Sequence, residues 1–280
     1  MQLERLATGG PDYEVFRFGR TKRAMRGPQP DFSTPYIAFI GGTETFGRFV
    51  MRPFTTQLAE ATGLGAANFG AVNGGVDLFL SDPEVLAACA AGRFCVVGVM
   101  GAHNMSNRFY AVHPRRNDRF VRASNTLKAI YPEVDFTEIH FSRHLLTTLR
   151  ATDSIRFAAV VEELRTAWVA RMKTLCDLAG GRIVLLWVAE GPPPARDYWQ
   201  EQGGGLGPDP LFIDREMLAE LDAHVLHRIE VVTSRAARAT GTDGMMFAPH
   251  EERAARCTPG PLAHREIADA LLARVEELAR

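Results

Sequence analysis

The residues best suited to chemistry in this chain follow an apolar run near residue 40. Tyr36–Ile40 is rich in aromatic and aliphatic side chains, and it leads directly into the polar turn Gly41–Gly47, with the sequence GGTETFG. A strand that ends in such a turn presents side chains at the edge of a sheet, where a ligand can reach them. Thr43 could act there as a nucleophile, and Glu44 as an acid or base.

Polar segments follow other apolar runs in the same way. Asn68–Asp77 overlaps and follows a weaker strand candidate at Ala66–Phe69, and Gly101–Asn107 follows a run at Phe94–Met100. Glu190–Pro194 occupies the same position after a later run. Ligands of parallel sheets bind at the carboxyl ends of the strands. We therefore expect these segments and the first polar turn to meet at one edge of a sheet.

The segment Asn107–Arg122 concentrates positive charge in a chain that is otherwise close to neutral. Its arginines are Arg108, Arg115, Arg116, Arg119 and Arg122. The planar guanidinium group suits carboxylate, sulfate and phosphate groups. Two interpretations stay open: an anion-binding surface beside the cleft, or a solvated face with ion pairs to acids near Asp118 and Glu133. RNA contact ranks behind both.

Strand and helix patterns alternate along the chain. The strand candidates are Tyr36–Ile40, Ala66–Phe69, Phe94–Met100, Arg182–Val188 and Arg228–Thr233. Helices are expected from Ser81 to about Ala91, through the apolar stripe of Phe157–Leu175, and over Pro259–Leu278. This alternation predicts an α/β fold, a three-layer sandwich with a mostly parallel central sheet.

Residues 36–280 are expected to form one domain, because this length can bury a single large core. Residues 1–35 are expected to form an N-terminal extension to that domain. The extension and the glycine-rich segment Gly203–Asp209 are both expected to be peripheral or mobile.

Two of the polar segments resemble motif blocks of the SGNH/GDSL hydrolases. In the first block, Gly-Asp-Ser-x-x-x-Gly, Gly42 falls on the aspartate and Thr43 on the nucleophilic serine. The second block, Asn-x-Gly-x-x-Gly, matches Asn68–Gly75 with one extra residue. The resemblance implies that the N–H of Gly74, or of Gly75, helps to bind an oxyanion; a tight turn is the other interpretation of these glycines.

Two further passages resemble later blocks of the same family. The third block, Gly-x-Asn-Asp, implies a hydrogen-bond donor at His103 or, with a one-residue shift, at Asn104. The fifth block places Thr258 on the catalytic histidine and Ala255 on its aspartate. His264 then matches a second, non-catalytic histidine, for which helix packing is the expected role.

The resemblance therefore implies the SGNH-type fold with altered or lost hydrolase chemistry, since threonine replaces both members of the dyad. His250 is the one nearby substitute for the missing base, although a surface histidine is the simpler interpretation. The whole sequence also resembles an uncharacterised bacterial domain family that shares the GGTET, NRFY and HPRRNDRF stretches. That resemblance implies no known activity.

Composition excludes several classes of function. The chain of 280 residues is 46% hydrophobic with a net charge of −1, which disfavours binding to nucleic acid or to a membrane surface. No run approaches the roughly 18 apolar residues of a membrane span. Its cysteines lack zinc-site spacing, and Cys89, Cys95 and Cys176 lie in apolar segments. We expect buried thiols, a cytoplasmic protein, no metal and no cofactor.

The expected ligand is a small molecule or glycan, specifically an acylated or anionic saccharide-type compound such as those met in polysaccharide modification. The chain either acts on this ligand as an altered esterase or acyltransferase, or is a catalytically inactive binding or assembly protein on the same fold. The sequence does not fix the oligomeric state.

Overall fold

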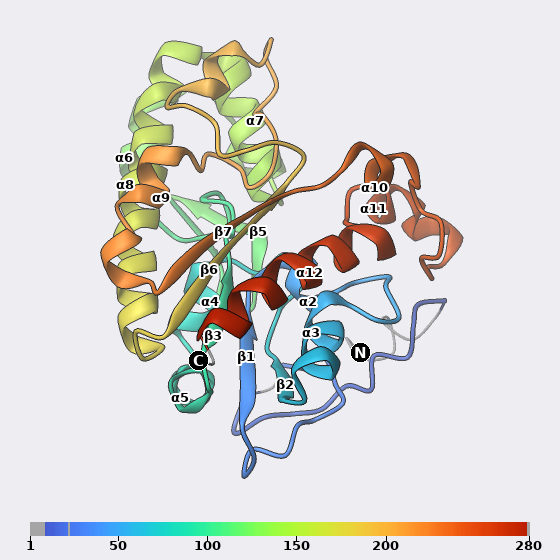
Figure 1. Ribbon diagram of the computed structural model, residues 1–280. Coiled ribbons are helices and arrows are strands. Elements are labelled where there is room, and N and C mark those ends of the chain that lie inside the picture. The colour runs from blue at the N-terminus through green and yellow to red at the C-terminus, as the bar shows by residue number, and fades with distance from the viewer. Residues whose placement is uncertain (1–8, 22, 279–280) are drawn as a thin grey trace.

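A computed structural model describes residues 9–21 and 23–278, and within them a five-stranded parallel sheet forms the centre of the molecule (Figure 1). Its strands are β1 (Tyr36–Ile40), β2 (Gly65–Asn68), β3 (Cys95–Gly98), β6 (Ile183–Ala189) and β7 (His227–Val232). They lie in the order β2-β1-β3-β6-β7, with every neighbouring pair parallel. The five predicted strands are confirmed, each within a residue or two at its ends.

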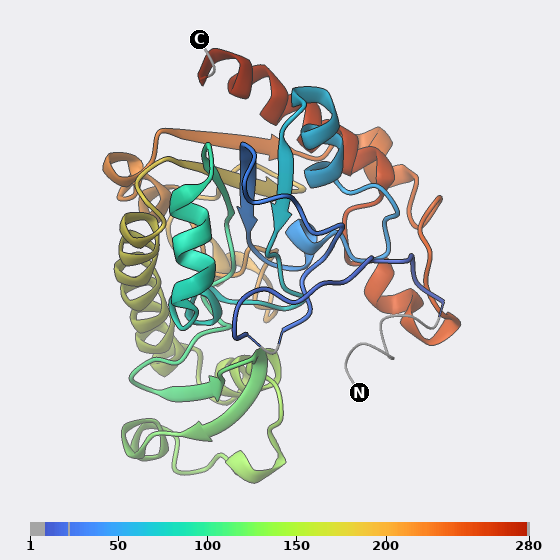
Figure 2. The same cartoon turned by 90° about the horizontal axis from the view of Figure 1, so that it is seen from below.

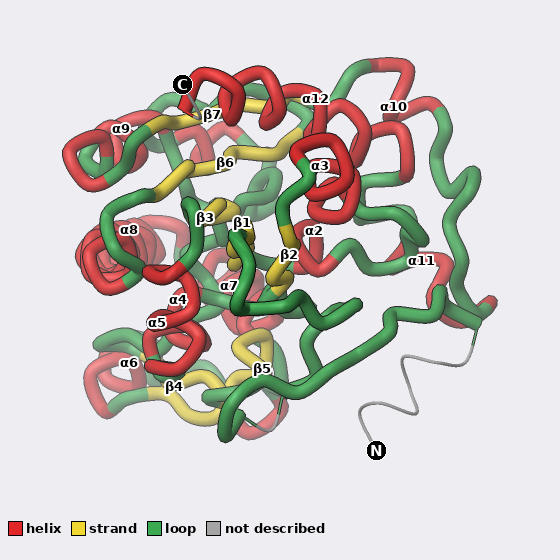
Figure 3. Tube along the Cα trace, turned by 60° about the horizontal axis from the view of Figure 1, so that its bottom comes forward, coloured by secondary structure: helices red, strands yellow, loops and turns green. Residues whose placement is uncertain are grey.

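Helices cover both faces of this sheet, which confirms the three-layer α/β sandwich. The longer helices are α3 (Phe54–Thr62), α5 (Pro83–Ala91), α7 (Ser142–Thr152), α8 (Ser154–Leu178) and α12 (Pro261–Leu278). The short ones are α2 (Thr43–Phe46), α4 (Val76–Leu80), α6 (Asn125–Ile130), α9 (Arg215–Ala219), α10 (Arg235–Ala239) and α11 (Glu252–Ala255). Figure 3 shows α3 and α12 on one side of the strands, and α5 and α8 on the other.

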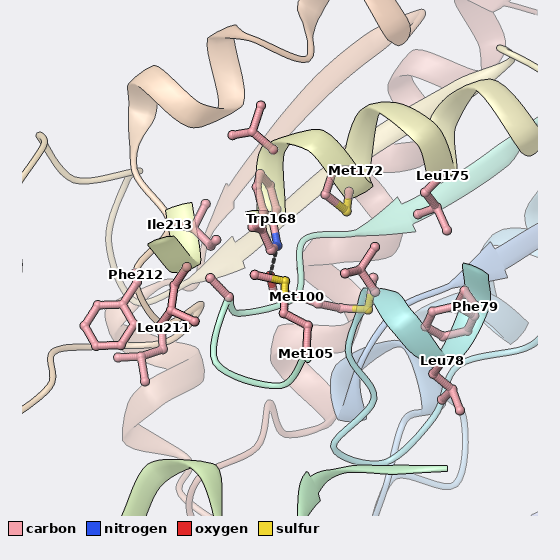
Figure 4. Close-up of a cluster of buried hydrophobic side chains, with 14 of the residues drawn as sticks. Leu78, Phe79, Met100, Met105, Trp168, Met172, Leu175, Leu211, Phe212 and Ile213 are labelled. Atoms are coloured by element: carbon pink, nitrogen blue, oxygen red, sulfur yellow. Dashed lines mark hydrogen bonds between the residues drawn. The ribbon is translucent and has the colours of Figure 1, made fainter. Parts of the chain in front are cut away.

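The alternation of side chains along β1 explains the two cores. Ala38 and Ile40 pack toward α5 and α8, whereas Ile37 and Phe39 pack toward α3 and α12. All four are fully buried, as expected for a parallel strand that is covered on both faces. The larger core extends under α8, where the indole N–H of Trp168 donates to the carbonyl of Met100 at 2.7 Å (Figure 4). This bond ties α8 to the loop that follows β3.

The arginine-rich segment forms a hairpin that was not predicted. β4 (Tyr110–His113) pairs with β5 (Arg116–Ala123) in an antiparallel ribbon with irregular register. Figure 2 shows this ribbon lying away from the central sheet. Buried side chains are interspersed with exposed ones, the arginines among them, along β5, because one face of the ribbon packs on α7 while the other faces solvent.

Part of the N-terminal segment is buried, so the peripheral position expected for it is wrong for Tyr13, Met25 and Arg26, whereas most of its other described residues are exposed or half-buried. The Arg26 guanidinium donates to four backbone carbonyls in the loop after α2, those of Phe46, Gly47, Val50 and Met51. Residues 1–8 lie outside the described part of the chain.

The buried cysteines are where the sequence predicted them. Cys89, Cys95 and Cys176 are buried and free in the core beneath α5 and α8, and Cys257 is exposed and free. Among the described residues, no helix is long and apolar enough to cross a membrane.

Candidate functional site

A polar cavity of about 140 Å³ lies at the carboxyl edge of the sheet. Its lining comes from the loops after β1, β2 and β3, from the end of β6, from the start of α7 and from the loop before α9. The side chains that carry polar groups are Thr43, Glu44, Thr45, Asn73, His103, Asn104, Arg143 and Asp209. The predicted meeting of Thr43, Gly74 and Asn104 in one cleft is therefore observed.

The short helix α2 holds Thr43 and Glu44 at the cavity. Its single turn follows β1 directly, and position 41 accepts only glycine because a Cβ there would overlap the Thr45 side chain. Thr45 is buried, whereas Thr43 and Glu44 are partly exposed. The tight turn after β1 thus directs the side chains of Thr43 and Glu44 to the cavity, while the side chain of Thr45 is buried.

Thr43 lacks the partner that an activated nucleophile needs. Its hydroxyl donates to Asn73 Oδ1 at 3.4 Å and accepts a hydrogen bond from the Asn73 N–H at 3.0 Å. Among the described residues, neither a histidine nor a carboxylate is hydrogen-bonded to Thr43 Oγ1. A hydroxyl without an adjacent base is a weak nucleophile, so the observed geometry makes Thr43 a structural link between two loops.

The two candidate oxyanion donors are already paired. The Gly74 N–H donates to the carbonyl of Ala71, and the Gly75 N–H donates to Asn117 Oδ1, both at 2.9 Å. A Cβ at Gly75 would overlap the backbone oxygen of Asn104, so only glycine fits at this crossing of two loops. The tight-turn interpretation describes Gly74, while Gly75 anchors the hairpin to the cavity wall.

Asn104 is a fixed part of the wall. Its Oδ1 accepts a hydrogen bond from the Ser142 hydroxyl at 2.7 Å, and its Nδ2 donates to the carbonyl of Asn73 at a longer 3.4 Å. The first bond ties the loop after β3 to the start of α7. The weaker amide contact leaves the Nδ2 group as the more readily redirected donor.

His103 carries a buried polar atom without a partner. The side chain is 7% exposed, and no described group is hydrogen-bonded to its Nδ1. Burial, followed by the positive charge of Arg143, lowers the pKa of His103 to about 4. The imidazole is therefore neutral at pH 7 and has an open hydrogen-bonding position, since buried polar atoms of this kind normally have a partner.

Glu44 lines the cavity near an ion pair formed by Arg143 and Asp209. Burial raises the pKa of the Glu44 carboxyl, and the negative charge of Asp209 raises it further. The guanidinium of Arg143 binds both oxygens of Asp209, and both side chains stay partly exposed. Among the described residues, no group of three or more His, Cys, Asp or Glu side chains is placed to hold a metal ion.

The remaining resemblance-based candidates lie outside the cavity lining. His250 is exposed in the short 3-10 turn Pro249–Glu251. The Thr258 hydroxyl donates to the carbonyl of Ala255 at 2.9 Å. His264 is fully buried on α12, where its Nδ1 accepts a hydrogen bond from the Phe54 N–H at 3.1 Å and its ring stacks on Phe54. The expected packing role of His264 matches this position.

The arginines of the hairpin also lie outside the cavity lining. Arg115 and Arg116 are exposed and form no ion pair with a described residue, while the guanidinium of Arg119 lies over the Phe141 ring at 4.1 Å. Arg108 pairs with Glu163. The hairpin nevertheless touches the cavity wall, because the Asn73 amide donates to Asp118 Oδ2 at 3.3 Å.

Four polar residues of the cavity were missed as candidates from the sequence: Thr45, Asn73, Arg143 and Asp209. Asp209 ends the glycine-rich segment that was expected to be peripheral or mobile; it is exposed, as expected, and it also lines the cavity beside Arg143. Arg143 lies on α7, far along the chain from the strand ends. Thr45 and Asn73 had a usable signal, since they belong to the polar segments that follow β1 and β2.

Comparison with known families gives a match over nearly the whole chain. One family profile matches residues 1–279, a region that includes the cavity, the hairpin and the buried N-terminal segment. No match was found among curated proteins or among solved structures. Because the profile covers far more than half of the sequence, the chain belongs to the family described as Domain of unknown function (DUF6473).

Proposed function

We propose that this protein binds an acylated or anionic saccharide-type ligand at the carboxyl edge of its sheet, and that the serine-esterase chemistry of the SGNH/GDSL hydrolases is lost. The strand order β2-β1-β3-β6-β7 supports the location of the binding site, because ligands of doubly wound sheets bind at this edge. The position of the polar segments after β1, β2 and β3 supports it as well.

The unpaired Nδ1 of His103 is the observation that carries the binding proposal. The His103 imidazole lines the cavity, and because its Nδ1 has neither a partner nor accessible surface, a ligand hydroxyl, amide or carbonyl would form the missing hydrogen bond after a small rotation of the ring. Glu44 and Asn104 add further hydrogen-bonding groups around the same space. Such planar amide, carboxyl and imidazole groups suit the closely spaced hydroxyl and acyl groups of a sugar derivative.

The size of the cavity limits what can enter it. About 140 Å³ is close to the ~150 Å³ cavity that holds a single benzene ring. One acyl or carboxylate group fits, while the rest of a saccharide would extend across the open mouth. The hairpin touches the cavity wall through Asn117 and Asp118, and the exposed Arg115 and Arg116 directly precede these two residues along the chain. These arginines favour a ligand that carries an acidic group.

Binding can be tested by isothermal titration calorimetry with matched sugars: N-acetylglucosamine, glucosamine, glucuronic acid and O-acetylated glucuronic acid. We expect the acetylated acid to bind most tightly. His103→Ala should weaken its binding by about ten-fold, the usual effect of a lost buried hydrogen bond. His250→Ala is the control, since that side chain is exposed outside the cavity. Equal binding by both variants would refute the role of His103.

A double variant, Arg115→Ala with Arg116→Ala, tests the acidic group separately. It should weaken the binding of glucuronate derivatives and have little effect on the binding of N-acetylglucosamine. The difference in affinity between the variant and the native protein should become smaller at high salt, because exposed charges are screened. The control is Arg253→Ala with Arg265→Ala, two exposed arginines elsewhere on the surface. If the hairpin variant melts at a lower temperature and binds every sugar equally well, the arginines are structural.

The loss of esterase chemistry has its own test. Hydrolysis of p-nitrophenyl acetate should stay near background, and a serine-directed fluorophosphonate should not label the protein, because Thr43 lacks a base. Turnover that disappears in Thr43→Ala would contradict this expectation.

A second candidate function is ester hydrolysis with water as the nucleophile and Glu44 as the general acid or base. The raised pKa of the Glu44 carboxyl favours it, since catalytic carboxyls are tuned toward neutral pH by burial. Release of acetate from an O-acetylated glucuronic acid, lost in Glu44→Gln while binding persists, would establish it. Unchanged acetate release in Glu44→Gln would exclude Glu44 as the catalytic group.

A further inference from the structure

A second cavity lies at the opposite edge of the sheet and has a different character. Its volume is about 460 Å³, within the range of roughly 300–1,000 Å³ that is usual for small-molecule sites. The residue directly before each of the five central strands contributes to its lining: Pro35, Leu64, Phe94, Arg182 and Leu226. The end of α3 and the last turns of α12 close it from one side.

Most of this lining is apolar. Leu226 is 45% exposed, and Leu64 and Leu272 are only partly buried against the core of the α3 and α12 face. Figure 2 shows the C-terminal turns of α12 extending beyond the strands, beside α3. An open apolar groove results between the overhanging helix and the amino ends of the strands, and covering it would be favourable.

Two arginines give the groove its charge. Arg93 and Arg182 both line it, both are exposed, and neither forms an ion pair with a described residue. They lie at the starts of the adjacent strands β3 and β6, where the Arg93 N–H donates to the carbonyl of Tyr36 and the carbonyl of Arg182 accepts from Cys95. Both side chains line this one groove at the starts of neighbouring strands, so an anion bound in it would lie near two positive charges. As far as the structure describes it, the lining contains no carboxylate.

We propose that this groove binds a single-chain amphipathic anion of the fatty-acid type. The hydrocarbon chain lies along Leu226, Leu272 and Val275 under α12, and the carboxylate pairs with Arg93 and Arg182. Both features are needed, because an uncharged apolar ligand leaves the two arginines unpaired and a small anion leaves the apolar groove open. This site is independent of the polar cavity and of the saccharide ligand proposed for it.

A second copy of the chain fits the groove less well than a fatty acid does. In a twofold-symmetric dimer the same patch is used by both subunits, so two pairs of guanidinium groups would face each other. Like charges placed together across an interface oppose association. A dimer through this face would need anions to bridge it, whereas one carboxylate per chain satisfies the charge directly.

The test is calorimetric titration of the full-length protein with octanoate, decanoate and dodecanoate below their micelle concentrations. We expect saturable binding of one molecule per chain. Each added methylene should tighten binding by up to roughly four-fold, the effect expected from its burial. Decyltrimethylammonium, which has a decyl chain and the opposite charge, should bind at least ten-fold more weakly than decanoate. Equal binding of the cation would overturn the proposal.

Matched variants locate the site. The double variant Arg93→Ala with Arg182→Ala should bind dodecanoate at least ten-fold more weakly than the native protein. The control variant, Arg253→Ala with Arg265→Ala, should bind it with unchanged affinity. Ala61→Trp narrows the groove at an exposed position. In this variant dodecanoate should bind no more tightly than decanoate. Unchanged binding in the Arg93 and Arg182 variant, or the absence of saturable binding to the native protein, would overturn the proposal. So would a dimer seen by sedimentation that the same double variant abolishes.

Discussion

His103 and Glu44 undergo opposite pKa shifts for the same main reason. Burial disfavours the charged form of each group, so it lowers the pKa of the imidazole and raises that of the carboxyl. His103 is consequently neutral at pH 7. It therefore presents a neutral hydrogen-bonding group to a cavity whose charged lining residues include the Arg143 and Asp209 ion pair.

His264 gives a prediction at the same scale. Burial lowers its pKa to about 3, against about 6.5 in the unfolded chain, so the stability that depends on its neutral form is complete above pH 6.5 and is lost as the pH falls toward 3. The slope is up to about 1.4 kcal/mol per pH unit. His264→Gln keeps an acceptor for the Phe54 N–H and cannot titrate.

Urea unfolding of the native protein and of His264→Gln between pH 7.5 and 5 measures this effect. We expect the variant to lose less stability than the native protein over this range, although His103 contributes a slope of the same sign in both. The exposed His250→Gln serves as control. Parallel curves for His264→Gln and the native protein would mean that His264 is not neutral in the folded state.

Strands and hairpin differ in how far the sequence predicts them. Each central strand is a continuous apolar run because both of its faces are buried, and such runs are visible without any knowledge of the fold. β5 instead carries Arg116, Arg119 and Arg122 on its solvent side. These charged residues interrupt the apolar run by which a strand is recognised in the sequence. The buried residues of β5, Asn117 and Phe120, become meaningful only once α7 and the Gly75 loop pack against them.

The cavity was predictable in part for a related reason. Segments that follow parallel strands must meet at one edge, so Thr43, Gly74 and Asn104 could be placed together in advance. Arg143 and Asp209 arrive from a helix and a loop whose packing on the sheet edge depends on long-range contacts. The His103 Nδ1 is unpaired because of how the surrounding residues pack, and no sequence pattern predicts this.

The contact between α8 and the loop after β3 gives a prediction for these elements. Trp168→Phe removes the indole N–H and leaves the buried carbonyl of Met100 without its donor (Figure 4). We expect a loss of about 2–4 kcal/mol in the free energy of unfolding, from the unpaired carbonyl and the smaller ring. Denaturant titration measures it. A loss below about 0.5 kcal/mol would show that this bond does not hold the loop.

At the scale of the whole molecule, the N-terminal segment stabilises the fold from outside the sheet. Arg26→Met should cost about 3–5 kcal/mol, since four backbone carbonyls lose a charged, buried donor. Arg26→Lys should recover part of this loss, because it keeps the charge with fewer donors. Thermal unfolding of the three proteins provides the comparison. An Arg26→Met variant as stable as the native protein would show that the four hydrogen bonds of Arg26 contribute little to the stability of the fold.

The distribution of the four thiols has a practical consequence. Burial raises the pKa of Cys176 to about 12, and a hydrogen bond with Cys89 together with burial raises the pKa of Cys95, so these two thiols offer little thiolate to a reagent. Cys257 is exposed just before α12. A maleimide dye or spin label should therefore attach at this one position in the native protein without mutagenesis. The label would report on the same helix whose far end borders the apolar groove.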